Sequence, residues 1–196
     1  MNSFTTSGPD WYLMRASGVV SLILLTGVVA LGIATTNRWR AGRLPRFVTL
    51  SLHRNVSLLA VAFVAIHVLT ALIDPYAAVT VLTIVVPFVA HGRAFWVGLG
   101  AVSLDLVLAL IVSSLLRRHL SQRLWRGIHW LAYVSWPVAL AHGLGLGTDA
   151  GTFWLQLITA ACVLLVGAAI VWGLWRHDGE DKHREPRAPA LEEAVT

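Results

Sequence analysis

The feature that most constrains this chain is a series of long apolar runs that carry almost no charge. A helix needs about 20 apolar residues to cross roughly 30 Å of hydrocarbon, and a spanning backbone must satisfy its own polar groups. The sequence therefore predicts an all-α, polytopic membrane bundle with five transmembrane helices. The runs cover residues 16–36, 55–73 (extendable back to Leu50), 94–116 (broken only by Asp105), 127–148 and 150–175.

Basic residues gather in alternate connections between these runs. Cytoplasmic loops of membrane proteins carry an excess of Lys and Arg, so the orientation places the N-terminus outside and the C-terminus in the cytoplasm. The net charge of +5 is then explained by basic loops that orient the chain in a bacterial plasma membrane. Nucleic acid is therefore not an expected partner. A hydrophobic share of 57% also excludes a soluble domain. The basic groups are Arg38, Arg40, Arg43 and Arg46; Arg117, Arg118, Arg123 and Arg126; and Arg176, Lys182, Arg184 and Arg187.

Three further segments complete the expected organisation. Residues 1–11 contain Asp10 and no basic residue, so they predict an extracytoplasmic tail before a retained helix, not a signal peptide. Residues 75–90 form a shorter apolar run. A crossing there would move the cluster 117–126 outside, so this run is expected to be an outer segment, interfacial or re-entrant. Residues 12–176 form the membrane domain, and residues 177–196 predict a disordered cytoplasmic tail.

Four histidines fall inside the expected spans, where unpaired polar groups are costly. His53 and His67 are 14 residues apart on one span, and His129 and His142 are 13 apart on another. At 1.5 Å per residue, each interval is about 20 Å, so the spans offer an inner and an outer histidine at matching depths. With about 3.6 residues per turn, His53 and His67 lie on the same face of their helix, whereas His129 and His142 do not. A kink at Pro137 is the expected correction.

Paired imidazoles at two depths favour haem as the ligand. Neutral imidazole is a common metal ligand, and haem iron takes one axial ligand on each side. The two levels are too far apart for one tetrahedral zinc site. The alternative is a small transporter or structural subunit whose histidines pack between helices without a cofactor. Within the haem class, a haem anchor of a quinol-linked oxidoreductase is a second alternative.

The two histidine segments resemble the haem helices of the ferric reductase-like transmembrane domain family, which includes NADPH oxidases and metalloreductases. The matching stretches are LHRNVSLLAVAFVAIHVL (52–69) and LWRGIHWLAYVSWPVALAHGL (124–144), within a resemblance covering about 12–175. The resemblance implies an inner b-type haem on His53 and His129 and an outer one on His67 and His142. It implies electron transfer from a cytoplasmic reduced flavin or quinol to an extracytoplasmic acceptor.

The chain departs from that family in two respects. Members often have six spans, and only a short polar tail follows the last span here. The expectation is an oxidoreductase component without its own flavin and nicotinamide domain. A separate flavoprotein, whose flavin is supplied or shared, or a quinol would then be the donor.

Several polar residues are secondary candidates. Arg54 and Arg126 lie close in sequence to the inner histidines and are expected either to pair with haem propionates or to anchor the loops. His91 and Arg93 lie in the outer segment, near the expected acceptor or outer propionates, or are simply solvated. Asp105, near the middle of the third span, is expected to be a buried functional carboxyl or a neutral packing residue.

Overall fold

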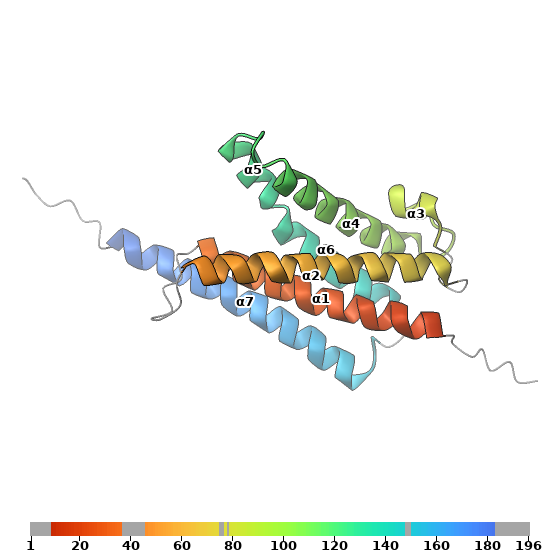
Figure 1. Ribbon diagram of the computed structural model, residues 1–196. Helices are drawn as coiled ribbons and strands as arrows, with labels where there is room; N and C mark the ends of the chain where they lie inside the picture. The colour runs from red at the N-terminus through yellow and green to blue at the C-terminus, as the bar shows by residue number, and fades with distance from the viewer. Residues whose placement is uncertain (1–8, 37–45, 75–76, 78, 148–149, 183–196) are drawn as a thin grey trace, which may run out of the picture.

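The computed structural model describes residues 9–36, 46–74, 77, 79–147 and 150–182, and every regular element in these ranges is a helix. The expectations for Arg38, Arg40, Arg43 and residues 183–196 lie outside the described residues. The helices are α1 (Pro9–Thr36), α2 (Arg46–Ile73), α3 (Val81–Val85), α4 (Ala94–Leu115), α5 (Gln122–His129), α6 (Ala132–Leu146) and α7 (Phe153–Lys182), shown in Figure 1.

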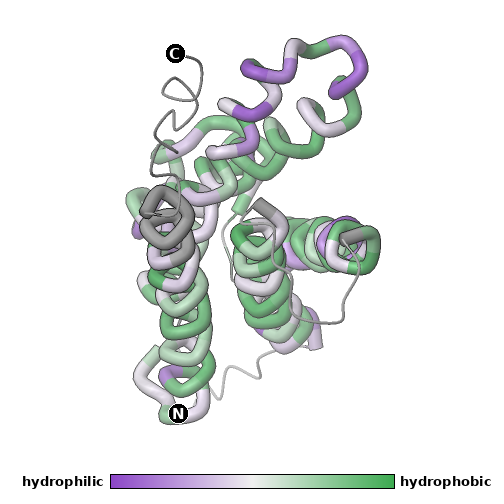
Figure 2. Tube along the Cα trace, turned by 90° about the vertical axis from the view of Figure 1, so that its left-hand side faces the viewer, coloured by the Kyte–Doolittle hydropathy of each residue, from purple (hydrophilic) through white to green (hydrophobic). Residues whose placement is uncertain are grey.

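The distribution of side chains is that of a protein in lipid. Large apolar residues face outward: Leu115, Phe153 and Trp175 are more than three-quarters exposed. Small hydroxyl residues are buried between helices, among them Ser17 and Ser135. Close helix packing through small residues, with apolar side chains outside, is typical of membrane bundles. Figure 2 shows hydrophobic colour along the helices and hydrophilic colour at the turn around α5. The protein is an integral membrane protein.

The predicted helical bundle is confirmed, while the predicted count of five spans is not confirmed. Among the described residues, four helices are long and apolar enough to cross a membrane: Pro9–Thr35, Phe47–Ile73, Ala94–Leu115 and Phe153–Trp175. The segment expected as the fourth span, residues 127–148, is instead divided between α5 and the 15-residue α6. The last helix, α7, continues to Lys182, into the segment expected to be a tail.

Helix α1 is the centre of the bundle. It packs against α2, α6 and α7, whereas α4 packs mainly against α6 (Figure 1). Trp136 of α6 is 8% exposed and lies in the core with residues of α1 and α7. Its indole Nε1 donates a hydrogen bond of 2.9 Å to Oγ1 of Thr26. Helix α2 is not among the closely packed neighbours of α4, α5 or α6, so a gap separates the two helix groups that carry the histidines.

The junction between α5 and α6 changes the helical phase. Backbone bonds of the i→i+3 type, 2.9 to 3.0 Å long, run from the amides of Leu131, Tyr133 and Val134. A residue in such a 3₁₀ turn advances by about 120°, against about 100° in an α-helix. The tighter winding moves His142 back toward the face of His129. These bonds place a change of phase at residues 128–134, ahead of the expected kink position at Pro137, which lies inside α6.

The outer segment forms a cap beside α4. It contains the single short helix α3, which packs on α4, and Thr80 caps that helix through a reciprocal pair of bonds with Thr83. Phe88 has a positive φ of 68°, and its ring occupies the space where Gly98 of α4 lacks a side chain. The glycine thus allows the cap to lie directly against the helix.

Candidate functional site: two histidine pairs

The outer pair consists of His67 on α2 and His142 on α6. Their ring centroids are 6.3 Å apart, and the ring planes are inclined by 78°. Both side chains are partly buried. The residues come from helices that do not pack closely on each other, so the imidazoles approach across the gap in the bundle.

Each outer imidazole is oriented by a backbone carbonyl. Nδ1 of His67 lies 2.9 Å from the carbonyl oxygen of Met14, and Nδ1 of His142 lies 2.8 Å from that of Trp96. A carbonyl can only accept, so each of these hydrogen bonds requires the proton on Nδ1, which in a neutral imidazole leaves the Nε2 lone pair free. This arrangement is typical of metal-ligating histidines, whose second nitrogen is held by a hydrogen bond.

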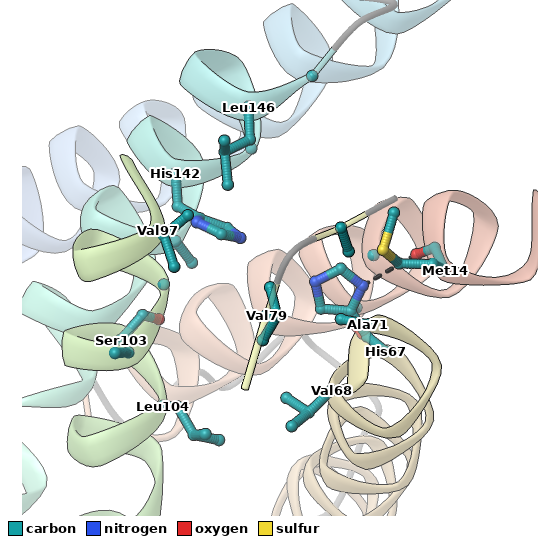
Figure 3. A pocket seen from close by; sticks show the side chains of 18 of the residues that line it. Met14, His67, Val68, Ala71, Val79, Val97, Ser103, Leu104, His142 and Leu146 are labelled. Carbon is teal, nitrogen blue, oxygen red and sulfur yellow. Dashed lines mark hydrogen bonds between the residues drawn. The ribbon is translucent and has the colours of Figure 1, made fainter. Parts of the chain in front are cut away.

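A cavity of about 550 Å³ lies between the outer histidines. Figure 3 shows His67 and His142 reaching into it from opposite helix groups, with Val68, Val97 and Leu104 among the apolar residues of its wall. Its size falls within the 300–1,000 Å³ that is usual for cofactor and ligand sites. His91 and Arg93 of the outer segment line the same cavity, as does Arg15 of α1.

The inner pair repeats the geometry of the outer pair. The ring centroids of His53 on α2 and His129 at the end of α5 are also 6.3 Å apart, with ring planes inclined by 67°. Nδ1 is buried without a hydrogen-bond partner in both inner rings. Within the described residues, no group of three or more His, Cys, Asp and Glu forms a metal cluster. The histidines meet as two separate pairs.

Helix α1 provides the same support at both levels. Gly18 faces His67, with its Cβ position 3.0 Å from the imidazole, and Gly32 faces His53 at 3.6 Å. The two glycines are 14 residues apart, as are the two histidines. Val28 is 14 residues after Met14, and its backbone lies beside the His53 ring as that of Met14 lies beside His67. Nδ1 of His53, however, has no hydrogen-bond partner. The antiparallel register of α1 and α2 thus creates two equivalent histidine positions.

The remaining sequence candidates occupy different surroundings. Arg54 and Arg126 are exposed, next to the inner pair in sequence. Asp105 is exposed on α4 and does not line the cavity, so the expectation of a buried carboxyl was wrong. The sequence places it mid-span, but only packing decides which face of α4 is covered. Two glycines after His142 also line the cavity, Gly143 and Gly147, whereas the ring of Trp96 fills the space beside Gly145.

Three residues at the histidine pairs were not predicted from the sequence: Arg15, Gly18 and Gly32. Arg15 lies over the ring of Trp11, with 5.6 Å from Cζ to the ring centroid, and Nη2 is 3.5 Å from the Cβ position of Gly147. The signal that could have revealed the glycines was their spacing, since the interval between Gly18 and Gly32 equals that between His53 and His67.

Comparison with known proteins places this architecture in a family. Residues 17–140 match the family described as "Ferric reductase like transmembrane component". The match includes His53, His67 and His129 and ends two residues before His142. Searches among curated proteins and among solved structures found no match. The match covers well over half of the chain, and the chain belongs to the ferric reductase-like transmembrane family.

Proposed function

We propose that this protein transfers electrons across the membrane through two b-type haems, each held by two histidines. His53 and His129 would bind the inner haem, and His67 and His142 the outer one. Family membership supports transmembrane electron transfer in general. The haems would supply the one-electron redox chemistry, and the residues of the chain would hold and orient them and exclude water.

The observation that carries the proposal is the equal separation of the two pairs. A metal–nitrogen bond of about 2 Å on each side, plus ~1.1 Å from each nitrogen to its ring centre, puts two axial imidazole centroids about 6 Å apart. Both pairs have 6.3 Å between their centroids. Imidazoles joined directly by a hydrogen bond would have closer centroids. Edge-to-face rings without a ligand are about 4.5–7 Å apart, so the spacing fits an intervening metal and cofactor content distinguishes the two arrangements.

The surroundings fit a porphyrin better than a bare ion. Two imidazoles per level leave the other coordination positions of the metal to be filled by the ring nitrogens of the cofactor. The outer pair opens on an apolar cavity, as a flat hydrophobic ring requires. Arg15 and Arg93 line that cavity and are suited to carboxylates such as haem propionates. Arg54 and Arg126 are the corresponding candidates at the inner level.

The direction of transfer follows from the proposed orientation. With the Arg-rich turn between α4 and α5 in the cytoplasm, His53 and His129 lie at the cytoplasmic end and His67 and His142 at the outer end. A cytoplasmic reduced flavin or quinol would donate its electrons one at a time, and an extracytoplasmic acceptor would receive them. The donor flavin would be supplied by a separate flavoprotein.

Cofactor content tests the proposal directly. The purified protein should show a b-type reduced-minus-oxidised spectrum, and a pyridine haemochrome assay should give two haems per chain. His67→Ala or His142→Ala should remove about half of the haem. His119→Ala, in the exposed turn after α4, is the matched control and should retain both haems. Absence of haem from protein made with sufficient haem supply would support packed histidines without a cofactor and overturn the proposal.

A further inference from the structure

His129 differs from the other three histidines in what holds its ring. His67 and His142 bond to carbonyl oxygens, and the Val28 backbone lies beside His53. The ring of His129 instead stacks on Trp125, one turn earlier in α5, with centroids 4.9 Å apart and planes inclined by 20°. A near-parallel indole restricts the rotation of the imidazole, as a hydrogen bond does at the outer pair.

A cation lies on the same indole. Cζ of Arg117 is 4.4 Å from the centroid of the Trp125 ring, which is a close cation–π contact. Arg117 follows the end of α4, and the turn into α5 brings it back to the helix. Ser121 stabilises that turn by accepting a hydrogen bond from the Leu124 amide. Arg117, Trp125 and His129 therefore form a continuous series of contacts that ends at the inner histidine pair.

We infer that Arg117 and Trp125 are positioning residues for the inner redox centre, and that the charge of Arg117 raises its reduction potential. The inference rests on the proposed haem at His53 and His129. In the titrated step one electron from a chemical reductant converts ferric to ferrous haem, which lowers the positive charge of the centre. A nearby fixed cation therefore favours the reduced state.

The expected size of the effect is moderate. For charges ~10 Å apart in a medium of effective dielectric constant about 20, Coulomb's law gives roughly a tenfold effect on the equilibrium. Arg117 is exposed, so solvent and salt reduce the effect of its charge. We expect a two- to tenfold change in the ratio of reduced to oxidised inner haem at a fixed potential. The outer centre, about 20 Å away along α2, should change much less.

The test is a redox titration of the full-length protein with its haems, resolved into two one-electron components. Arg117→Gln should lower the reduction potential of one component, so that its ratio of reduced to oxidised haem at a fixed potential falls two- to tenfold. The other component should be unchanged. Arg118→Gln is the matched control, because it removes the same charge from the next exposed residue. Equal shifts in the two variants, or no shift in Arg117→Gln, would overturn the inference.

Variants at Trp125 separate the stack from the charge. Trp125→Phe keeps an aromatic face and should retain a potential close to that of the native protein. Trp125→Leu should broaden the spectrum of one haem, and in that background Arg117→Gln should have a smaller effect than in the native chain. An undiminished effect would show that Arg117 does not act through Trp125 and would contradict the contact series.

The haemochrome assay distinguishes the two possible failures. If the native protein binds no haem, the proposed function fails and this inference fails with it. If two haems bind and their potentials do not respond to Arg117, only this inference fails.

Discussion

The Cβ position of Gly100 lies 2.5 Å from Cε1 of His142, so the imidazole fills the space that a side chain at position 100 would need. Glycine at this point of α4 lets His142 bond to the Trp96 carbonyl and still reach the cavity. A larger residue would have to push the ring aside. The backbone of α4 therefore helps to set the outer histidine pair.

Gly100→Ala is expected to reduce outer haem occupancy several-fold while the inner haem remains. The added methyl group displaces His142, and a ligand displaced by even a fraction of an ångström loses its alignment. Haem content per chain measures the effect. Gly167→Ala on α7 is the control, because nothing lies within 4 Å of its Cβ position. Equal haem loss in both variants would show that general instability, not His142, is responsible.

The two glycines of α1 should differ in their tolerance of a side chain. Gly32→Ala is expected to retain the inner haem, because a contact of 3.6 Å with His53 is ordinary. Gly18→Ala brings Cβ to 3.0 Å from His67 and should weaken outer haem binding. Gly32→Leu should then lose the inner haem selectively. Spectra of the reduced variants measure how much of each haem remains. Greater haem loss in Gly32→Ala than in Gly18→Ala would contradict the prediction.

The hydrogen bond between Trp136 and Thr26 should contribute to stability. Thr26 is 2% exposed, so Thr26→Val leaves the indole N–H without its acceptor in the core. The expected cost is about 1–3 kcal/mol, and Thr26→Ser should recover most of it. Thermal unfolding in detergent measures the change. Thr35→Val is a control expected to cost less, because the Thr35 hydroxyl donates to the carbonyl of Gly32 within its own helix.

Asp105→Leu should leave both haems in place. The carboxyl is exposed on α4 and lies outside the cavity, and an acidic group at mid-span is unfavourable in hydrocarbon. Stability in a lipid nanodisc should therefore be unchanged or higher. Haem content and the unfolding temperature provide the measurement. A loss of haem would mean that Asp105 acts within the bundle.

The features that could be predicted from the sequence are those that depend on periodicity and local composition. Apolar runs predicted the helical bundle, and the spacing of His53 and His67 predicted two levels on one helix. The structure then brings each predicted pair together, with equal separation in both. The depth of a histidine follows from the constant rise of a helix, so this part could be predicted without coordinates.

What the sequence did not reveal depends on tertiary contacts. The exposure of Asp105 is decided by which neighbours α4 has, and no periodic pattern on this almost wholly apolar helix marks a face. At the junction after His129, a few backbone amides form i→i+3 bonds of the 3₁₀ type in place of the i→i+4 bonds of an α-helix. Arg117 reaches Trp125 only because the intervening turn folds back. Such contacts have no signature in the spacing of residues.

The repeated support that α1 gives to α2 has a consequence for the speed of electron transfer. Electron tunnelling declines exponentially with distance, so a relay works at a constant rate only if its two centres keep their separation. Here His53 and His67 lie on one uninterrupted helix, braced by glycines of a second. If electrons pass as proposed, helical rise fixes the distance of the internal step. The rate of that step can then vary only through the potentials of the two centres, as proposed for Arg117.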